Sequence, residues 1–176
     1  MSSGKQTRGH DSDPSQPAER GSEHLSVLAE ALAPEPPDPA VRARLLAALH
    51  GPERFTPHAG EVARVFELDQ DAAREALLRI HDRAAWQPGF WPQSEHLVTD
   101  ALMQKQALIA RLPGGMRIPR HIHQARELTY ILDGELIEDG KLLHVSGALM
   151  DMARGSAHEV VVRGQQCLVV FAFRFA

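Results

Sequence analysis

Glycine residues recur about once every ten positions through the second half of the chain, between stretches rich in apolar, β-branched and aromatic residues. These stretches carry no helix-capping signal, so we expect strands at Leu102 to Leu112, Leu128 to Leu132, Lys141 to Val145 and Glu159 to Phe175. Short strands separated by glycine turns predict an antiparallel barrel or sandwich. The glycines that separate the strands are Gly114, Gly115, Gly134, Gly140, Gly147, Gly155 and Gly164.

Residues 24–83 have the apolar spacing of helices instead of strands. Asp38-Pro39 and Thr56-Pro57 are start signals for two helices, and Asp69 can cap another helix that extends through His81. We therefore expect several short amphipathic helices, with a single helical hairpin as the alternative. One of these helices should carry an apolar stripe of Val41, Leu45, Leu46 and Leu49.

The sequence thus predicts an α+β protein in four parts. Residues 1–23 are polar with almost nothing to bury, and we expect a disordered arm. Residues 24–83 form the short helical region, and residues 84–96, with their tryptophans and prolines, form a linker. Residues 97–176 form the antiparallel β-barrel.

The composition excludes several classes of protein. The net charge is −4 and the pI is about 6.2, which argues against nucleic acid or an anionic membrane as the main partner. No apolar run approaches the roughly 20 residues that span a bilayer, and residues 1–23 lack an apolar signal-peptide segment. The single cysteine, Cys167, cannot form an internal disulfide. We expect a soluble cytoplasmic protein.

Four side chains in the strand region are candidate metal ligands: His121, His123, Glu127 and His158. His121 and His123 are two positions apart, so both leave the same face of a strand. If the sheet curls, Glu127 and His158 can converge with them. Three neutral imidazoles and a carboxylate suit a first-row divalent metal.

A His-x-His pair alone is more often exposed or hydrogen-bonded than bound to metal, but the glycines around this pair favour the metal site. Gly115, His121, His123, Glu127 and Gly134 match the pattern G-x5-H-x-H-x3-E-x6-G at every position. This pattern is the first motif of the cupin family, which the C-terminal half of the chain therefore resembles.

The second cupin motif, G-x5-P-x-G-x2-H-x3-N, is matched by Gly147, Gly155 and His158. Ala153 stands where proline is usual and Val162 where asparagine is usual, and neither position is a metal ligand. The resemblance implies a double-stranded β-helix, or jelly roll, whose interior holds a metal on three histidines and one glutamate. Dimers through strand edges are a further family expectation.

The helical region followed by a cupin also resembles ChrR-type anti-sigma factors. In that family a helical zinc domain holds a sigma factor, and a C-terminal cupin governs its release under oxidative stress. The helical zinc motif of that family, H-x3-C-x2-C, is absent, because the chain has no cysteine before Cys167. Sigma-factor binding therefore stays an open question.

The sequence leaves two functions open. A closed zinc site would make the chain a ChrR-like sensor or regulator, which we favour because the helical part is long for a small enzyme. Iron, manganese or nickel with open positions would instead make a dioxygenase or isomerase. Cys167 is expected in the core and His144 on a strand surface, whereas Tyr130 and Arg111 are left unassigned.

Overall fold

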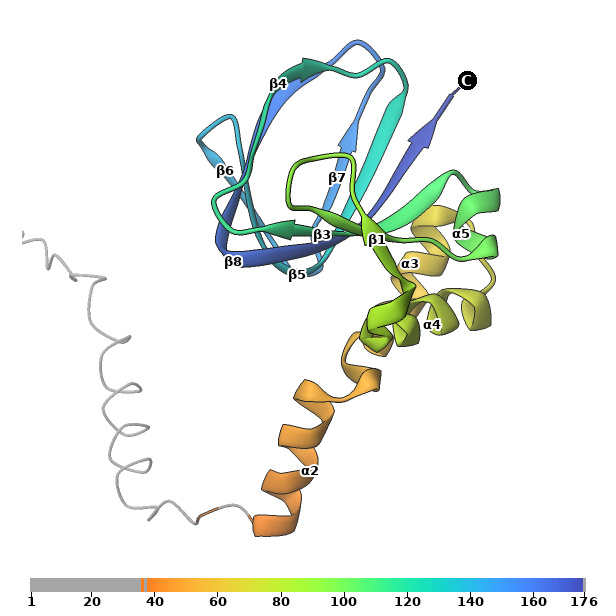
Figure 1. Ribbon diagram of the computed structural model, residues 1–176, viewed down its shortest axis with the longest axis vertical. Helices are drawn as coiled ribbons and strands as arrows, with labels where there is room; N and C mark the ends of the chain where they lie inside the picture. Colours follow the sequence, from red (N-terminus) through yellow and green to blue (C-terminus); the bar gives the residue numbers. More distant parts are fainter. Residues whose placement is uncertain (1–35, 37, 176) are drawn as a thin grey trace, which may run out of the picture. The chain divides into compact units, whose positions relative to one another are not determined.

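The computed structural model describes residue 36 and residues 38–175, and the part from Ala43 onward forms one compact unit (Figure 1). The arm expected at residues 1–23 and the helix expected from Leu25 to Leu32 lie outside the described residues. The helices are α2 (Pro39–His50), α3 (Ala59–Phe66), α4 (Gln70–Leu78) and α5 (Asp100–Gln104), with 3-10 segments η1 (Pro52–His58), η2 (Arg79–His81) and η3 (Arg83–Ala85).

Capping side chains explain where two of the expected helices begin. The carboxylate of Asp38 accepts a hydrogen bond of 2.7 Å from the backbone N–H of Ala40, and Pro39 opens α2. Asp69 likewise accepts from the backbone N–H groups of Asp71 and Ala72 at the start of α4. Both predicted starts are confirmed.

The start signal expected at Thr56 and Pro57 is wrong. Both residues lie inside η1, and α3 begins only at Ala59. The physical reason is that the hydroxyl of Thr56 donates to the carbonyl of Glu53 at 2.9 Å and does not accept from the following turn. The helix predicted through His81 does stay helical to that residue, but α4 ends at Leu78 and the last turn is the tighter 3-10 segment η2.

The second half of the chain is one antiparallel sheet. Its strands run in the order β1-β2-β3-β8-β5-β6, while β4 pairs with β8 and β7 pairs with β5. The strands are β1 (Trp86–Pro88), β2 (Glu95–Leu97), β3 (Ala107–Pro113), β4 (Arg117–Ile122), β5 (Arg126–Glu138), β6 (Leu142–Val145), β7 (Leu149–Met152) and β8 (Ala157–Arg174).

The sheet curls around an interior but is not the closed barrel that the sequence led us to expect. Among the described residues no pairing joins β1 to β6, so both remain sheet edges. The curvature comes from β5 and β8, which are long enough to pair with three strands each. The α+β class and the helices-then-sheet order are as predicted.

One further strand expectation needs correction, and the segment expected as a linker contains strands of its own. The stretch from Leu102 to Leu112 begins as helix α5, because the Thr99 hydroxyl accepts from the backbone N–H of Leu102 and caps a helical turn; β3 starts only at Ala107. The segment 84–96 contains β1 and most of β2, which form a hairpin on the edge of β3.

Gly134 and Gly164 were expected in turns but lie inside β5 and β8. At each glycine the even-numbered and odd-numbered residues of the strand exchange faces of the sheet, a change that we call a parity switch. Each has a positive φ, 91° at Gly134 and 78° at Gly164. The β5–β8 register shifts around Gly134, so that Ile131 before it and Leu136 after it pack in the same inner core although their numbers differ by five. A strand without a bulge would put them on opposite faces.

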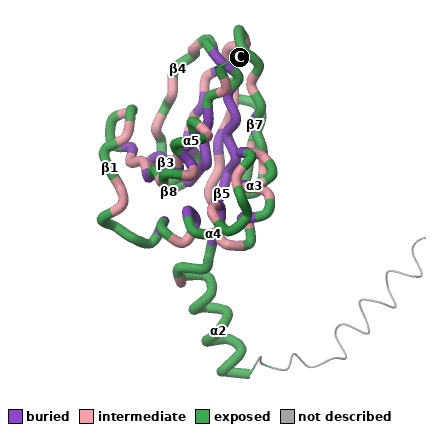
Figure 2. The backbone as a smooth tube through the Cα atoms, turned by 90° about the vertical axis from the view of Figure 1, so that its right-hand side faces the viewer, coloured by how far each residue is buried: buried purple, intermediate pink, exposed green. Residues whose placement is uncertain are grey.

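The two faces of the sheet therefore build two cores. The outer core joins the helices to the sheet, with Phe66 and Leu77 fully buried against residues such as Tyr130 and Val170. Fully burying one such large apolar side chain contributes about 1.5–3 kcal/mol. The inner core lies in the curl of the sheet, and Figure 2 shows the buried stretches gathered along the strands.

Replacing Gly134 with alanine tests the parity switch. A Cβ at Gly134 would lie 2.9 Å from Cys167 Cα and still closer to the Gln166 carbonyl oxygen. We expect Gly134→Ala to lower the free energy of unfolding by about 2 kcal/mol or more, measured by chemical denaturation. Gly140→Ala is the matched control: Gly140 also has a positive φ but no atom within 4 Å of the new Cβ, so about 1 kcal/mol is expected. Equal losses would contradict the close-packing argument.

Candidate metal centre

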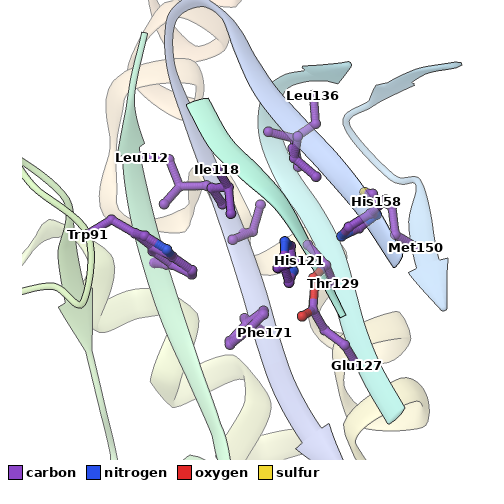
Figure 3. Close-up of a pocket in the computed structure, with 13 residues that line it drawn as sticks. Trp91, Leu112, Ile118, His121, Glu127, Thr129, Leu136, Met150, His158 and Phe171 are labelled. Carbon is purple, nitrogen blue, oxygen red and sulfur yellow. Dashed lines mark hydrogen bonds between the residues drawn. The ribbon is translucent and has the colours of Figure 1, made fainter. Parts of the chain in front are cut away.

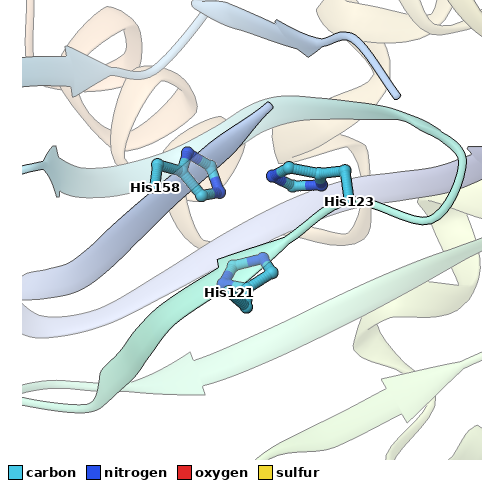
Figure 4. A group of neighbouring side chains, drawn as sticks. All are labelled: His121, His123 and His158. Atoms are coloured by element: carbon cyan, nitrogen blue, oxygen red, sulfur yellow. The ribbon is translucent and has the colours of Figure 1, made fainter. Parts of the chain in front are cut away.

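Three histidines from two adjacent strands meet in the interior of the sheet. His121 on β4 lies directly opposite His158 on β8, and His123 follows the end of β4. One ring nitrogen of each histidine can act as a metal ligand, and these three atoms all lie within 4.8 Å of one another (Figure 4). The turn at Gly155 brings them together, because the backbone of His123 bonds to Gly155 N–H at 2.8 Å and to the Ser156 carbonyl at 3.0 Å.

Three ring nitrogens of His123 and His158 have no hydrogen-bond partners. Both nitrogens of His123 and Nε2 of His158 are buried and unpartnered. Leaving such polar atoms buried without a bond costs about 1–3 kcal/mol each. His121 Nδ1 lies 3.0 Å from the Pro119 carbonyl, which can only accept, so this nitrogen carries the proton and Nε2 keeps its lone pair. This donor set fits a divalent metal.

Glu127 on β5 lies beside the imidazoles. Its Oε2 is 3.2 Å from His123 Nδ1, without the alignment of a hydrogen bond, and its Oε1 accepts from the Thr129 hydroxyl at 3.1 Å. The ligand atoms that lie within 4.8 Å of one another belong to the three histidines, and the Glu127 carboxylate lies next to them. The four-ligand set predicted from the sequence therefore stays a prediction.

Burial is the largest influence on the pKa values of His123 and Glu127. Burial, reinforced by the nearby His158 and His121, lowers the pKa of His123 and favours its neutral, metal-ligating form. Burial also raises the pKa of Glu127, although the Thr129 hydrogen bond and the neighbouring His158 and His121 oppose this shift. A cation among these residues would favour the ionised form of Glu127.

A cavity of about 30 Å³ adjoins the histidines, with room for an ion or about two water molecules (Figure 3). His121, Glu127, Thr129 and His158 supply its polar side. The rest of the lining is apolar and comes from Trp91, Ala110, Leu112, Ile118, Leu136, Met150, Val160, Val169 and Phe171.

Glu138, which no sequence pattern indicated, holds the His158 ring of the cluster. Its Oε1 lies 2.9 Å from His158 Nδ1, and its Oε2 lies 2.9 Å from His144 Nε2. Burial alone would raise the pKa of Glu138, but the hydrogen bonds from His158 and His144 outweigh burial and lower it. No motif marks this residue, and only the parity switch at Gly134 turns it toward His158.

The remaining candidates lie away from the cluster. His144 is on a strand as expected, but it is half-buried against Glu138. Tyr130 faces the helices and its hydroxyl lies 2.9 Å from His58 Nδ1. Arg111 pairs with Glu95 at 2.6 Å and stacks on Trp86. Cys167 is fully buried in the inner core, as predicted.

No family model and no curated protein matches the chain. Similar solved structures include proteins described as cupin-like. One, from Ralstonia eutropha JMP134, is a protein of unknown function with a cupin-like fold; it is 19% identical, with a TM-score of 0.37, and the match covers 39% of this chain but only 46% of that one.

Two other matches have assigned roles of different kinds. The complex of Rhodobacter sphaeroides SigE with the anti-sigma ChrR matches at 23% identity and a TM-score of 0.45, covering 86% of this chain and 75% of that chain. An acetylacetone dioxygenase from Acinetobacter johnsonii matches at 11% identity and a TM-score of 0.42, covering 52% and 69% of the respective chains. At these similarities the matches carry no functional argument.

The buried thiol should be chemically inert in the native protein. Burial, followed by the charge of Asp133, raises the pKa of Cys167 to about 12, which leaves about one thiolate in ten thousand molecules at about pH 8. We expect iodoacetamide to label Cys167 only after denaturation, as measured by intact-mass spectrometry. Rapid labelling of the folded protein would contradict this prediction.

Proposed function

We propose that this chain is a metal-binding protein that holds one divalent ion with His121, His123, Glu127 and His158. The observation that carries the proposal is the convergence of three imidazoles, of which His123 and His158 have buried nitrogens without hydrogen-bond partners. Metal coordination would satisfy Nε2 of His158 and one nitrogen of His123 and so offset part of the penalty of burying them. Zinc is the expected ion, with iron, manganese or nickel as alternatives.

We further propose that the bound metal serves a sensor or regulator. The cavity of about 30 Å³ is much smaller than the roughly 300–1,000 Å³ of pockets that bind organic ligands. Glu127, as a ligand, is not a free general base, and Glu138 already accepts from two histidines. These features support a site that responds to its metal or to a very small molecule.

Such a regulator needs a protein partner, and helix α2 offers apolar surface for one. None of its residues is buried within the described part of the chain, although four of them are large and apolar. Exposed apolar side chains on one helix favour contact with another protein. The resemblance to ChrR-type proteins makes a sigma factor the partner to test first. The exposed residues are Val41, Leu45, Leu46 and Leu49.

The alternative function is a metal-dependent enzyme of the dioxygenase or isomerase type. One observation favours it: the cavity beside the histidines is lined mostly by apolar side chains such as Leu136 and Phe171, which would suit a very small apolar reactant. A Lewis-acidic metal would supply the electrophile there. Turnover with iron or manganese would support the enzyme, whereas zinc in a closed four-ligand site would exclude this version of it.

Removing either of two facing histidines tests the metal site. We expect His121→Ala and His158→Ala to abolish stoichiometric metal, measured by elemental analysis of protein purified without chelator or metal-binding tag. Wild-type protein with metal at about 100 times Kd should gain about 2.7 kcal/mol of stability, and the variants should not. His50→Ala, which changes an exposed histidine at the end of α2, should behave as wild type. Unchanged metal content in the variants would refute the site.

Partner capture tests the regulatory role. Metal-loaded protein used as bait should retain a sigma factor, and oxidant should release it. The paired variant Leu45→Glu and Leu49→Glu should abolish capture while leaving metal content unchanged, because it adds charge only at exposed positions of α2. Capture of no sigma factor, with or without oxidant, would count against the regulator and in favour of the enzyme.

A further inference from the structure

His158 is the histidine of the cluster that is most firmly held by another side chain. Its side chain is only 2% exposed, and its Nδ1 lies 2.9 Å from Glu138 Oε1. His121 is instead held by a backbone carbonyl, and neither ring nitrogen of His123 has a hydrogen-bond partner. The Glu138 contact therefore singles out His158.

The contact determines which nitrogen of His158 is available to a metal. An ionised carboxylate can only accept a hydrogen bond, so Nδ1 must carry the proton. Neutral imidazole has one proton on its two nitrogens, so Nε2 keeps its lone pair. Nε2 is also the buried, unpartnered nitrogen that belongs to the cluster.

Glu138 itself is fixed at both oxygens. Its second oxygen lies 2.9 Å from Nε2 of His144, a residue of the neighbouring strand β6. In the sheet Glu138 pairs with Val160 on β8 and with Leu142 on β6, so both histidines are diagonal neighbours two residues away. The carboxylate therefore cannot turn away from His158 without breaking its bond to His144.

We propose that Glu138 is the positioning residue of the metal centre: it fixes His158 with Nε2 toward the ion, and His144 holds Glu138 in place. This inference rests on the proposed metal-binding function. A carboxylate that accepts from the second nitrogen of a ligating histidine orients the ring and raises its basicity, and removing it typically weakens metal binding 10- to 100-fold.

The test compares three variants with a matched control. Glu138→Ala should raise the Kd for Zn²⁺ about 10- to 100-fold in chelator competition while the stoichiometry stays at one ion per chain. Glu138→Gln keeps an oxygen acceptor and should recover part of this loss, and His144→Ala should weaken binding less than Glu138→Ala does. Glu135 lies on the same strand as Glu138, and Glu135→Ala, which breaks an exposed pair with Arg163 of β8, should bind as wild type.

A second readout needs no metal. Long-range ¹H–¹⁵N NMR of the metal-free protein should show His158 protonated at Nδ1 in the wild type and in Glu138→Gln, but a mixture of tautomers in Glu138→Ala. A mainly structural role for Glu138 would lower stability without this change in tautomer. If Glu138→Ala does not fold, the Zn²⁺ affinities of Glu138→Gln and His144→Ala test the positioning role instead.

The outcomes separate this inference from the function on which it rests. Wild-type protein that binds no metal would refute the proposed function, while the tautomer measurement would still test the role of Glu138. Wild-type protein that binds metal, with Glu138→Ala within about twofold of its Kd and His158 in the same tautomer, would overturn the positioning role alone.

Discussion

The backbone of β5 at Gly134 decides which side chains face the interior of the sheet. With a φ of 91° and the backbone of Gln166 and Cys167 pressed against it, this position accepts no side chain without strain. The bulge there moves Leu136 and Glu138 onto the face that already holds Thr129 and Ile131. The inner core and the contact between Glu138 and His158 both depend on it.

Gly164 has the corresponding role in β8. Even-numbered residues before this glycine, His158 and Val160, line the cavity. After the glycine the odd-numbered Val169 and Phe171 line the same cavity. The opposite face of the same strand packs on the helices through residues such as Val170. One face of β8 therefore lines the candidate metal site, and its other face packs in the helix–sheet core.

The proposed centre combines features that oppose each other in the absence of a metal. Burial disfavours a charged Glu127 and leaves His123 with two unpartnered nitrogens. A divalent cation would offset both effects, since it would stabilise the carboxylate and accept the lone pair of one His123 nitrogen. Among the described residues no helix is both long and apolar enough to cross a membrane.

The sequence determined the elements that depend on local chemistry. Asp38 and Asp69 start helices because their carboxylates reach the next backbone N–H groups. The glycines around the His-x-His pair and the resemblance to the two cupin motifs predicted that His121, His123 and His158 converge. Local signals failed at Thr56, whose hydroxyl bonds backward, and at Leu102, where the Thr99 cap prevails over strand-forming residues.

Only the tertiary structure decided the rest. Glu138 and His144 belong to no motif, and their contact with His158 requires the bulge at Gly134 together with the pairing of β5 with both β6 and β8. The open edge at β1 likewise depends on which strands find partners. Local sequence specifies turns and caps because these involve neighbouring residues, whereas register and strand parity depend on segments far apart in the chain.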